Sequence, residues 1–186
     1  YKDKVAEFNR LAAQHARSVA PEGHFVVGSV GPTGEILESN GGTARESEVL
    51  DAFIEQITAL EAGGADAVDI ETMISVQEAT LAIKAAKENT NLLVISTMMF
   101  DIGPRGWFTM MGDTPESAVK DTQDAGANIV GANCGNGIEL MVELAEQMRA
   151  HAEAFGLTIK SGQVTEVGLS DSPADPDLKV ARTEAG

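Results

Sequence analysis

The residues LEAGGADAVDIET, at positions 60–72, decide the fold of this chain. They contain the end of a helix, a pair of glycines typical of a helix C-terminus, a short apolar run and an acidic residue. The stretch QDAGANIVGANC, at positions 123–134, repeats this order with a Gly-Ala turn, an apolar run and a polar end. This recurrence predicts repeated βα units, which suit a barrel at least as well as an open sheet.

The apolar runs of the chain predict a parallel sheet. They are continuous rather than alternating, which is typical of strands buried on both faces. Stretches of crossover length with helical periodicity separate them, and such crossovers join parallel strands. We therefore predict parallel neighbours in chain order near residues 25–29, 67–71, 92–97, 128–132 and 157–160. Five strands do not close an eight-stranded barrel.

Helices are predicted between these strands. Residues 3–19 and 45–64 place apolar side chains at helical spacing. Capping patterns mark the starts of the later helices. The predicted starts are Ser75 with Glu78, Thr114 before Pro115, and Asn136 with Glu139.

The composition is that of a globular protein with a strong acidic bias. The chain has 186 residues, of which 43% are hydrophobic, and 29 acidic against 13 basic residues give a net charge of -16. Nucleic acids and anionic membranes bind basic patches, so neither is expected as a partner. No signal peptide or membrane-spanning run is evident, and we expect a cytoplasmic protein. A helical pattern is already running at Tyr1, so we expect the chain to begin inside a larger sequence.

Chemistry in parallel α/β proteins lies at the carboxyl ends of the strands. The first such end is GSVGPTGE, residues 28–35. Gly28, Gly31 and Gly34 allow a ligand to approach the backbone closely, and Pro32 stiffens the turn. The loop lacks the Gly-Lys-Ser/Thr ending of a phosphate loop and the spacing of a dinucleotide fingerprint. An ordinary strand-to-helix turn is the alternative.

Glu71 stands at the second strand end, directly after an apolar run. A carboxylate is costly to bury unpaired, but at a strand end it can hold the ammonium group of a ligand in a charge-assisted hydrogen bond. A partly solvated loop acid, or a cap for the following helix, is the alternative.

Cys134 is the only cysteine and follows the fourth apolar run. A nucleophilic thiolate needs a histidine base, yet His15, His24 and His151 lie in helical stretches or before the first strand. A catalytic zinc site takes three protein ligands, which one cysteine cannot supply. A packed thiol is the alternative, because free cysteines are among the most buried residues.

Four motifs stand in the same order as in the homocysteine S-methyltransferase family. They are GSVGPTGE, DIET, STMMFD followed by FTMMGDTPESAV, and GANCGNG. The chain most resembles the homocysteine-binding domain of cobalamin-dependent methionine synthase and its bacterial relatives, over residues 1–160. Residues 161–186 are rich in Ser, Gly, Pro and Asp and are expected to form a loop-rich or flexible tail.

The resemblance implies a (β/α)8 barrel of which about five consecutive βα units are present here. It also implies an enzyme in which zinc, bound by three cysteines, activates the homocysteine thiol as a thiolate that accepts a methyl group, forming methionine. The donor implied by the resemblance is a corrinoid such as cobalamin, carried by another domain or subunit, or another methyl compound. Carried over to this sequence, the implied zinc ligand is Cys134, the residue beside the substrate is Asn133, the amine-binding carboxylate is Glu71, and the pocket loop is Gly31, Pro32, Thr33 and Gly34.

The chain also departs from the family. The family supplies its other two zinc ligands from an adjacent cysteine pair near the end of the barrel, and this chain has no such pair. Two alternative functions therefore remain open besides a zinc-dependent enzyme. They are a binding or assembly module without metal, and a corrinoid- or pterin-linked methyltransferase barrel without zinc. Since a partial barrel leaves strand edges uncovered, we also expect self-association.

Overall fold

The structure, a computed structural model, describes residues 2–154, 164–169 and 179–183. It divides into two compact units, residues 1–156 and 157–186. The predicted strand at 157–160 lies outside the described residues.

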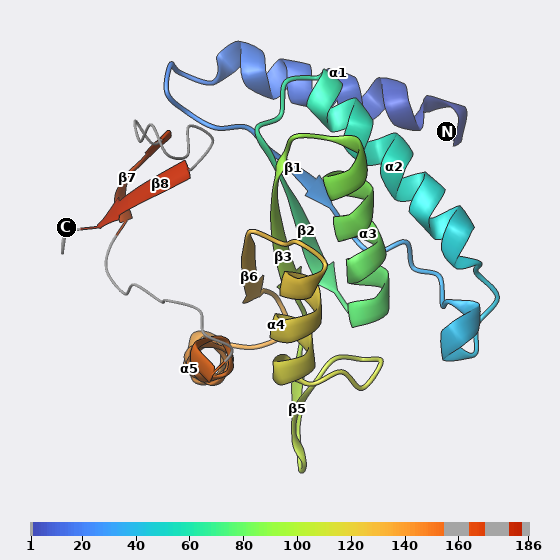
Figure 1. The fold of residues 1–186 in the computed structure, drawn as a ribbon, viewed down its shortest axis with the longest axis vertical. Coiled ribbons are helices and arrows are strands. Elements are labelled where there is room, and N and C mark those ends of the chain that lie inside the picture. Colours follow the sequence, from blue (N-terminus) through green and yellow to red (C-terminus); the bar gives the residue numbers. More distant parts are fainter. Residues whose placement is uncertain (1, 155–163, 170–178, 184–186) are drawn as a thin grey trace. The chain divides into compact units, whose positions relative to one another are not determined.

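A four-stranded parallel sheet forms the centre of the first unit (Figure 1). Its order is β1-β2-β3-β6, and every neighbouring pair is parallel, which confirms the first four predicted strands and their order. A register shift between Ile70 and Met73 interrupts the pairing of β2 with β3 near its carboxyl end. The strands are β1 (Val27–Val30), β2 (Ala67–Met73), β3 (Leu93–Met98) and β6 (Ile129–Ala132).

Helices alternate with the strands of this sheet along the chain, beginning with α1 before β1, and each helix packs against the next (Figure 1). Helix α2 contacts β1, α3 contacts β2 and β3, and α4 and α5 contact β6. The helices are α1 (Val5–Val19), α2 (Glu46–Ala62), α3 (Val76–Asn89), α4 (Pro115–Asp124) and α5 (Ile138–Ala154), with 3-10 turns η1 (Lys2–Lys4) and η2 (Glu38–Asn40). This succession of parallel strands and helices confirms the α/β class, whereas a closed barrel stays a prediction.

Burial differs between the two faces of the sheet. One face is packed, and its side chains Val30, Val68, Ile70 and Val94 have no exposed surface. Residues at the alternate positions are more open, and Val27 at one edge and Ile129 at the other are 47% and 57% exposed. The prediction that both faces are buried is therefore wrong for the edge strands, because the described helices of this unit contact the sheet without covering those positions.

Two antiparallel strand pairs were not predicted. β4 (Asp101–Gly103) and β5 (Gly106–Phe108) form a hairpin between β3 and α4, with the Arg105 guanidinium 5.4 Å from the centre of the Phe108 ring. β7 (Val164–Leu169) pairs with β8 (Lys179–Thr183) in the second unit. The sequence did not indicate these strands, because such short mixed-polarity segments carry no apolar run that marks a strand.

The structure confirms one of the three predicted helix caps and corrects the other two. Thr114 and Ser117 form a full capping box on α4. Ser75 accepts a hydrogen bond from the Glu78 backbone N–H, but the Glu78 side chain bonds elsewhere, so the predicted capping box on α3 is half formed. Helix α5 begins at Ile138, and the side chain of Asn136 donates to the Phe100 carbonyl, so this residue is not its cap.

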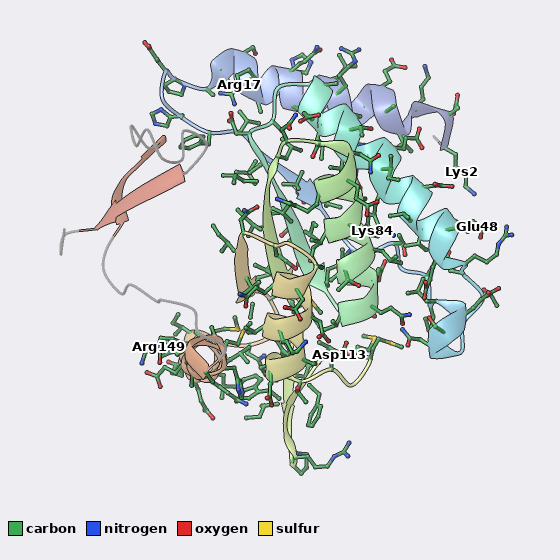
Figure 2. All side chains as sticks on the ribbon, viewed as in Figure 1. Lys2, Arg17, Glu48, Lys84, Asp113 and Arg149 are labelled. Atoms are coloured by element: carbon green, nitrogen blue, oxygen red, sulfur yellow. The ribbon has the colours of Figure 1, made fainter. Side chains whose placement is uncertain are left out.

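Other side chains fix the ends of α1 and α3. Asp113, labelled in Figure 2, accepts hydrogen bonds from the Val76 backbone N–H and the Thr109 hydroxyl, each at 2.9 Å. Arg17, on α1 in the same figure, forms an ion pair with Asp66 just before β2. The Asp113 contact thus holds the segment after β2, on the side where the predicted site residues lie, and the Arg17 contact holds the segment before β2.

Candidate functional site

The predicted site residues follow the carboxyl ends of parallel strands. The loop 31–34 follows β1, Glu71 lies in the last three residues of strand β2, and Asn133 and Cys134 follow β6. Because the strands are parallel, these carboxyl ends all lie at the same end of the sheet. Fold and register alone therefore bring residues that are up to about 100 positions apart in the chain to that end.

Thr72 and Asn133 connect two of these strand ends by reciprocal hydrogen bonds. The Thr72 backbone N–H donates to Asn133 Oδ1 at 3.0 Å, and Asn133 Nδ2 donates to Thr72 Oγ1 at 2.8 Å. Thr72 has a φ of 59°, which is unfavourable for a β-branched residue. The backbone N–H of Asn133 donates to the Met98 carbonyl at 3.1 Å, so β3 fixes the same loop.

Cys134 lies against this pair. Its Sγ atom is 3.6 Å from Thr72 Oγ1 and 3.5 Å from Asn133 Nδ2, and the residue is exposed. Its φ is 60°, and the next residue, Gly135, also has a positive φ, of 82°. A Cβ atom at Gly135 would come within 3.1 Å of the Phe100 carbonyl oxygen, so glycine is required for this close approach. The thiol is thus accessible rather than packed.

Glu71 belongs to a pair of carboxylates on one face of β2. The Ser29 hydroxyl donates to Glu71, and the Thr97 hydroxyl donates to Asp69 at 3.4 Å. Burial, followed by the charge of Glu71, raises the pKa of the Asp69 carboxyl above its ordinary value. This face of β2 therefore concentrates negative charge beside the strand end, which suits a cationic group.

The glycine loop is held by a buried carboxylate. Both the backbone N–H and the hydroxyl of Thr33 donate to Glu78 Oε1 at 2.7 Å, and Glu78 is 3% exposed. Gly34 has a φ of 80°, whereas a Cβ at Gly31 would meet nothing within 4 Å. Gly28 has a packing role instead, because a Cβ there would lie 2.7 Å from Leu60 of α2.

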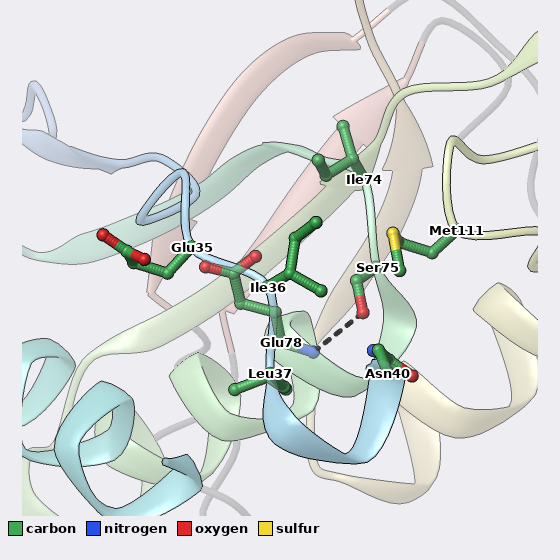
Figure 3. A pocket seen from close by; sticks show the side chains of 8 residues that line it. All are labelled: Glu35, Ile36, Leu37, Asn40, Ile74, Ser75, Glu78 and Met111. Atoms are coloured by element: carbon green, nitrogen blue, oxygen red, sulfur yellow. Dashed lines mark hydrogen bonds between the residues drawn. The ribbon is translucent and has the colours of Figure 1, made fainter. Parts of the chain in front are cut away.

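A small pocket lies beside this loop (Figure 3). Its volume of about 20 Å³ is on the scale of one ordered water, so it is too small for an amino acid. It is lined by Glu35, Ile36, Leu37, Asn40, Ile74, Ser75, Glu78 and Met111. Neither Glu71 nor Cys134 lines it, so this pocket does not include the strand-end residues.

The described residues do not by themselves fit a zinc ion. No group of three or more His, Cys, Asp or Glu side chains in the described ranges could hold a metal. The side chains that contact the Cys134 sulfur are a hydroxyl and an amide, which are poor zinc ligands. Cys134 thus supplies one ligand of the three that a catalytic site takes.

Sequence reasoning missed four residues of this edge. Thr72 was placed at the strand end beside Glu71 but was given no role, and Ser29 and Asp69 were not distinguished from other strand residues. Glu78 was interpreted only as a helix cap. Alternation along β2 could have indicated Asp69, because it places residues 69 and 71 on one face.

Comparison with known proteins defines the class. The family model of homocysteine S-methyltransferase matches residues 1–175. The chain therefore belongs to the homocysteine S-methyltransferase family, as its motifs predicted.

Individual relatives share moderate identity with this chain. It is 32% identical to betaine–homocysteine S-methyltransferase 1 of Sus scrofa over 150 residues, covering 80% of this chain and 51% of that protein. It is 26% identical to methionine synthase of Mycobacterium leprae (strain TN) over 195 residues, covering 99% of this chain and 16% of that protein. The chain spans about half the length of the pig relative and less of the other.

A solved structure gives a weaker match. The homocysteine methyltransferase MmuM from Escherichia coli, in its apo form, has a TM-score of 0.39 and 14% identity, with coverage of 81% of this chain and 73% of that chain.

Within the described ranges, no helix has the length and apolar character to cross a bilayer.

Proposed function

We propose that this chain is part of a methyltransferase that transfers a methyl group to the thiol of homocysteine and forms methionine. Membership of the family supports the reaction class. The observation that carries the proposal is the contact of Cys134 with the Thr72–Asn133 pair, at the carboxyl end of the sheet, where Thr72 directly follows Glu71. A (β/α)8 barrel that includes β1, β2, β3 and β6 is the proposed complete fold.

The strand-end residues have distinct roles in this proposal. Glu71 holds the ammonium group of homocysteine in a charge-assisted hydrogen bond. Asn133 positions the substrate beside Cys134, since its amide is already fixed against Thr72. The loop Gly31, Pro32, Thr33 and Gly34 lines the amino-acid pocket, and Glu78 keeps this loop in place.

Zinc is proposed as the metal of the complete site, with Cys134 as one ligand. When bound, zinc stabilises a thiolate near neutral pH. Its remaining ligands have to come from outside the described residues, because the described ones supply only one. We propose that the methyl donor, a corrinoid such as cobalamin or another methyl compound, is carried by another domain or subunit, and that the protein acts in the cytoplasm.

A binding or assembly module without metal is the second candidate. The single cysteine of the chain favours it, because a catalytic zinc site with family-type thiolate ligands needs three. A corrinoid- or pterin-linked barrel without zinc is a third. These alternatives share the homocysteine pocket or barrel but differ in metal content.

Binding of homocysteine tests the proposal. Glu71→Ala should weaken binding of L-homocysteine more than binding of 4-mercaptobutanoate, which lacks the amino group, because only the former loses an ion pair. Isothermal titration of both ligands measures this selectivity. Equal losses for the two ligands would contradict the ammonium role. A methyl-transfer assay with homocysteine then separates an enzyme from a binding module.

A further inference from the structure

The hydroxyl of Ser29 controls one of the two carboxylate oxygens of Glu71. Ser29 lies on β1 and donates to Glu71 Oε1 on β2. Its backbone is fixed on both sides, because the residue pairs with Asp69 in the sheet and its carbonyl accepts a hydrogen bond from Gln56 Nε2 at 3.4 Å. The backbone of Ser29 is therefore held in place, and its hydroxyl contacts a long and otherwise flexible side chain.

The direction of this hydrogen bond is diagonal. In the register Ser29 lies opposite Asp69, yet its hydroxyl bonds to Glu71, two residues further along the same face. Asp69 accepts instead from Thr97 on the opposite neighbour, β3. The two carboxylates are thus held toward different strands, which separates like charges that would otherwise compete for one cation.

One oxygen of Glu71 remains for a ligand. In the described part of the chain, Glu71 makes no hydrogen bond or ion pair other than the one from Ser29. A hydroxyl that occupies Oε1 fixes the orientation of the group and directs Oε2 to another donor. Fixing a glutamate side chain before binding also reduces the conformational entropy lost when a ligand orders it.

We propose that Ser29 is a positioning residue that orients Glu71 to receive the ammonium group of the amino-acid substrate. This inference rests on the proposed function of Glu71. It assigns Ser29 an effect on selectivity for the amino group, rather than on the thiol or on folding.

The test compares binding of L-homocysteine and 4-mercaptobutanoate to the 186-residue chain by isothermal titration. Ser29→Ala should lower the preference for homocysteine by roughly 3- to 10-fold, the scale of one ordinary hydrogen bond, because Ser29 acts only through the orientation of Glu71. Ser29→Thr, which keeps the hydroxyl, should restore it. Thr97→Val removes the corresponding hydroxyl from Asp69 and should leave the preference unchanged.

Two outcomes separate this inference from the proposed function. If Glu71→Gln lowers the preference and Ser29→Ala does not, the positioning role is wrong and the ammonium role stands. If Glu71→Gln also leaves the preference unchanged, both are wrong. Crystal structures provide a readout without ligand: the Glu71 carboxylate should leave its position in Ser29→Ala and keep it in Ser29→Thr, and an unmoved carboxylate in Ser29→Ala would overturn the inference.

Discussion

Thr72 and Asn133 are 61 residues apart in the chain and exchange two hydrogen bonds at the carboxyl ends of β2 and β6, although β3 lies between these strands. The pair fixes both the left-handed conformation of Thr72 and the side chain that contacts Cys134. The site thus depends on a link across three strands.

Asn133→Ala should reduce both stability and homocysteine binding. It removes both hydrogen bonds to Thr72 and leaves the Thr72 N–H without its acceptor, at a cost of about 1–3 kcal/mol. Asn128→Ala is the matched control, because Asn128 accepts from the Val94 N–H near the start of β6, away from the site. Urea unfolding should show a loss for both variants and titration a binding loss for Asn133→Ala alone. Equal binding losses would contradict a local role for Asn133.

Glu78→Leu should release the glycine loop, whereas Glu78→Gln should largely keep it. Leucine removes two hydrogen bonds from the exposed Thr33 to a charged group, at a cost of about 1–3 kcal/mol, while glutamine retains an acceptor oxygen. Denaturant unfolding measures the stability, and hydrogen exchange measures protection of the Thr33 amide. If that amide exchanges equally fast in the native chain and in Glu78→Leu, the Glu78 contact does not hold the loop.

Asp69→Asn should stabilise the protein at neutral pH. The pKa of Asp69 is raised in the folded state, first by burial and then by Glu71, so the folded state binds this proton more tightly than the unfolded state. The contribution of Asp69 to stability therefore falls as the pH rises from the ordinary pKa of an aspartate through the raised pKa that Asp69 has in the folded state. Asparagine cannot ionise, so it removes this loss.

This effect is measured by unfolding free energies between about pH 3 and 7, a range that includes the ordinary pKa of aspartate. Asp66→Asn serves as the control, because Asp66 is paired with Arg17 and accepts from the Val26 N–H, so its replacement should lower stability. A neutral-pH loss in Asp69→Asn like that in Asp66→Asn would show that the Asp69 charge is favourable.

The chain by itself should bind zinc weakly and give little methyl transfer to homocysteine. Cys134 is one thiolate, and its described neighbours are not zinc ligands. Zinc content after dialysis, measured by atomic emission for the native chain and Cys134→Ala, tests this. Stoichiometric zinc that depends on Cys134 in a monomeric chain would show that the ligand count is wrong.

Self-association is expected through the edges of the sheet. β1 and β6 each pair with one strand in the described sheet, and Val27 and Ile129 on them are exposed. Sedimentation should detect dimers or larger species, and Val27→Lys together with Ile129→Lys should reduce them. A strictly monomeric native chain with one cooperative unfolding transition would argue that these edges are covered.

The sequence by itself determined the order of the parallel strands and the places where polar residues end them. Continuous apolar runs separated by helical periodicity admit few other topologies, and short motifs such as GANCGNG identified the family. Local signals also predicted the Thr114 cap, because a capping box involves only neighbouring residues.

Only the tertiary structure decided which partner each polar side chain takes. Glu78 matches a helix cap in sequence, yet it bonds to Thr33, 45 residues away, and Asn136 bonds to the Phe100 carbonyl instead of starting α5. Ser29 reaches Glu71 rather than Asp69, its partner in the register. Hydrogen-bond partners depend on distances between strands and loops that are remote in the chain, and periodicity carries no information about those distances.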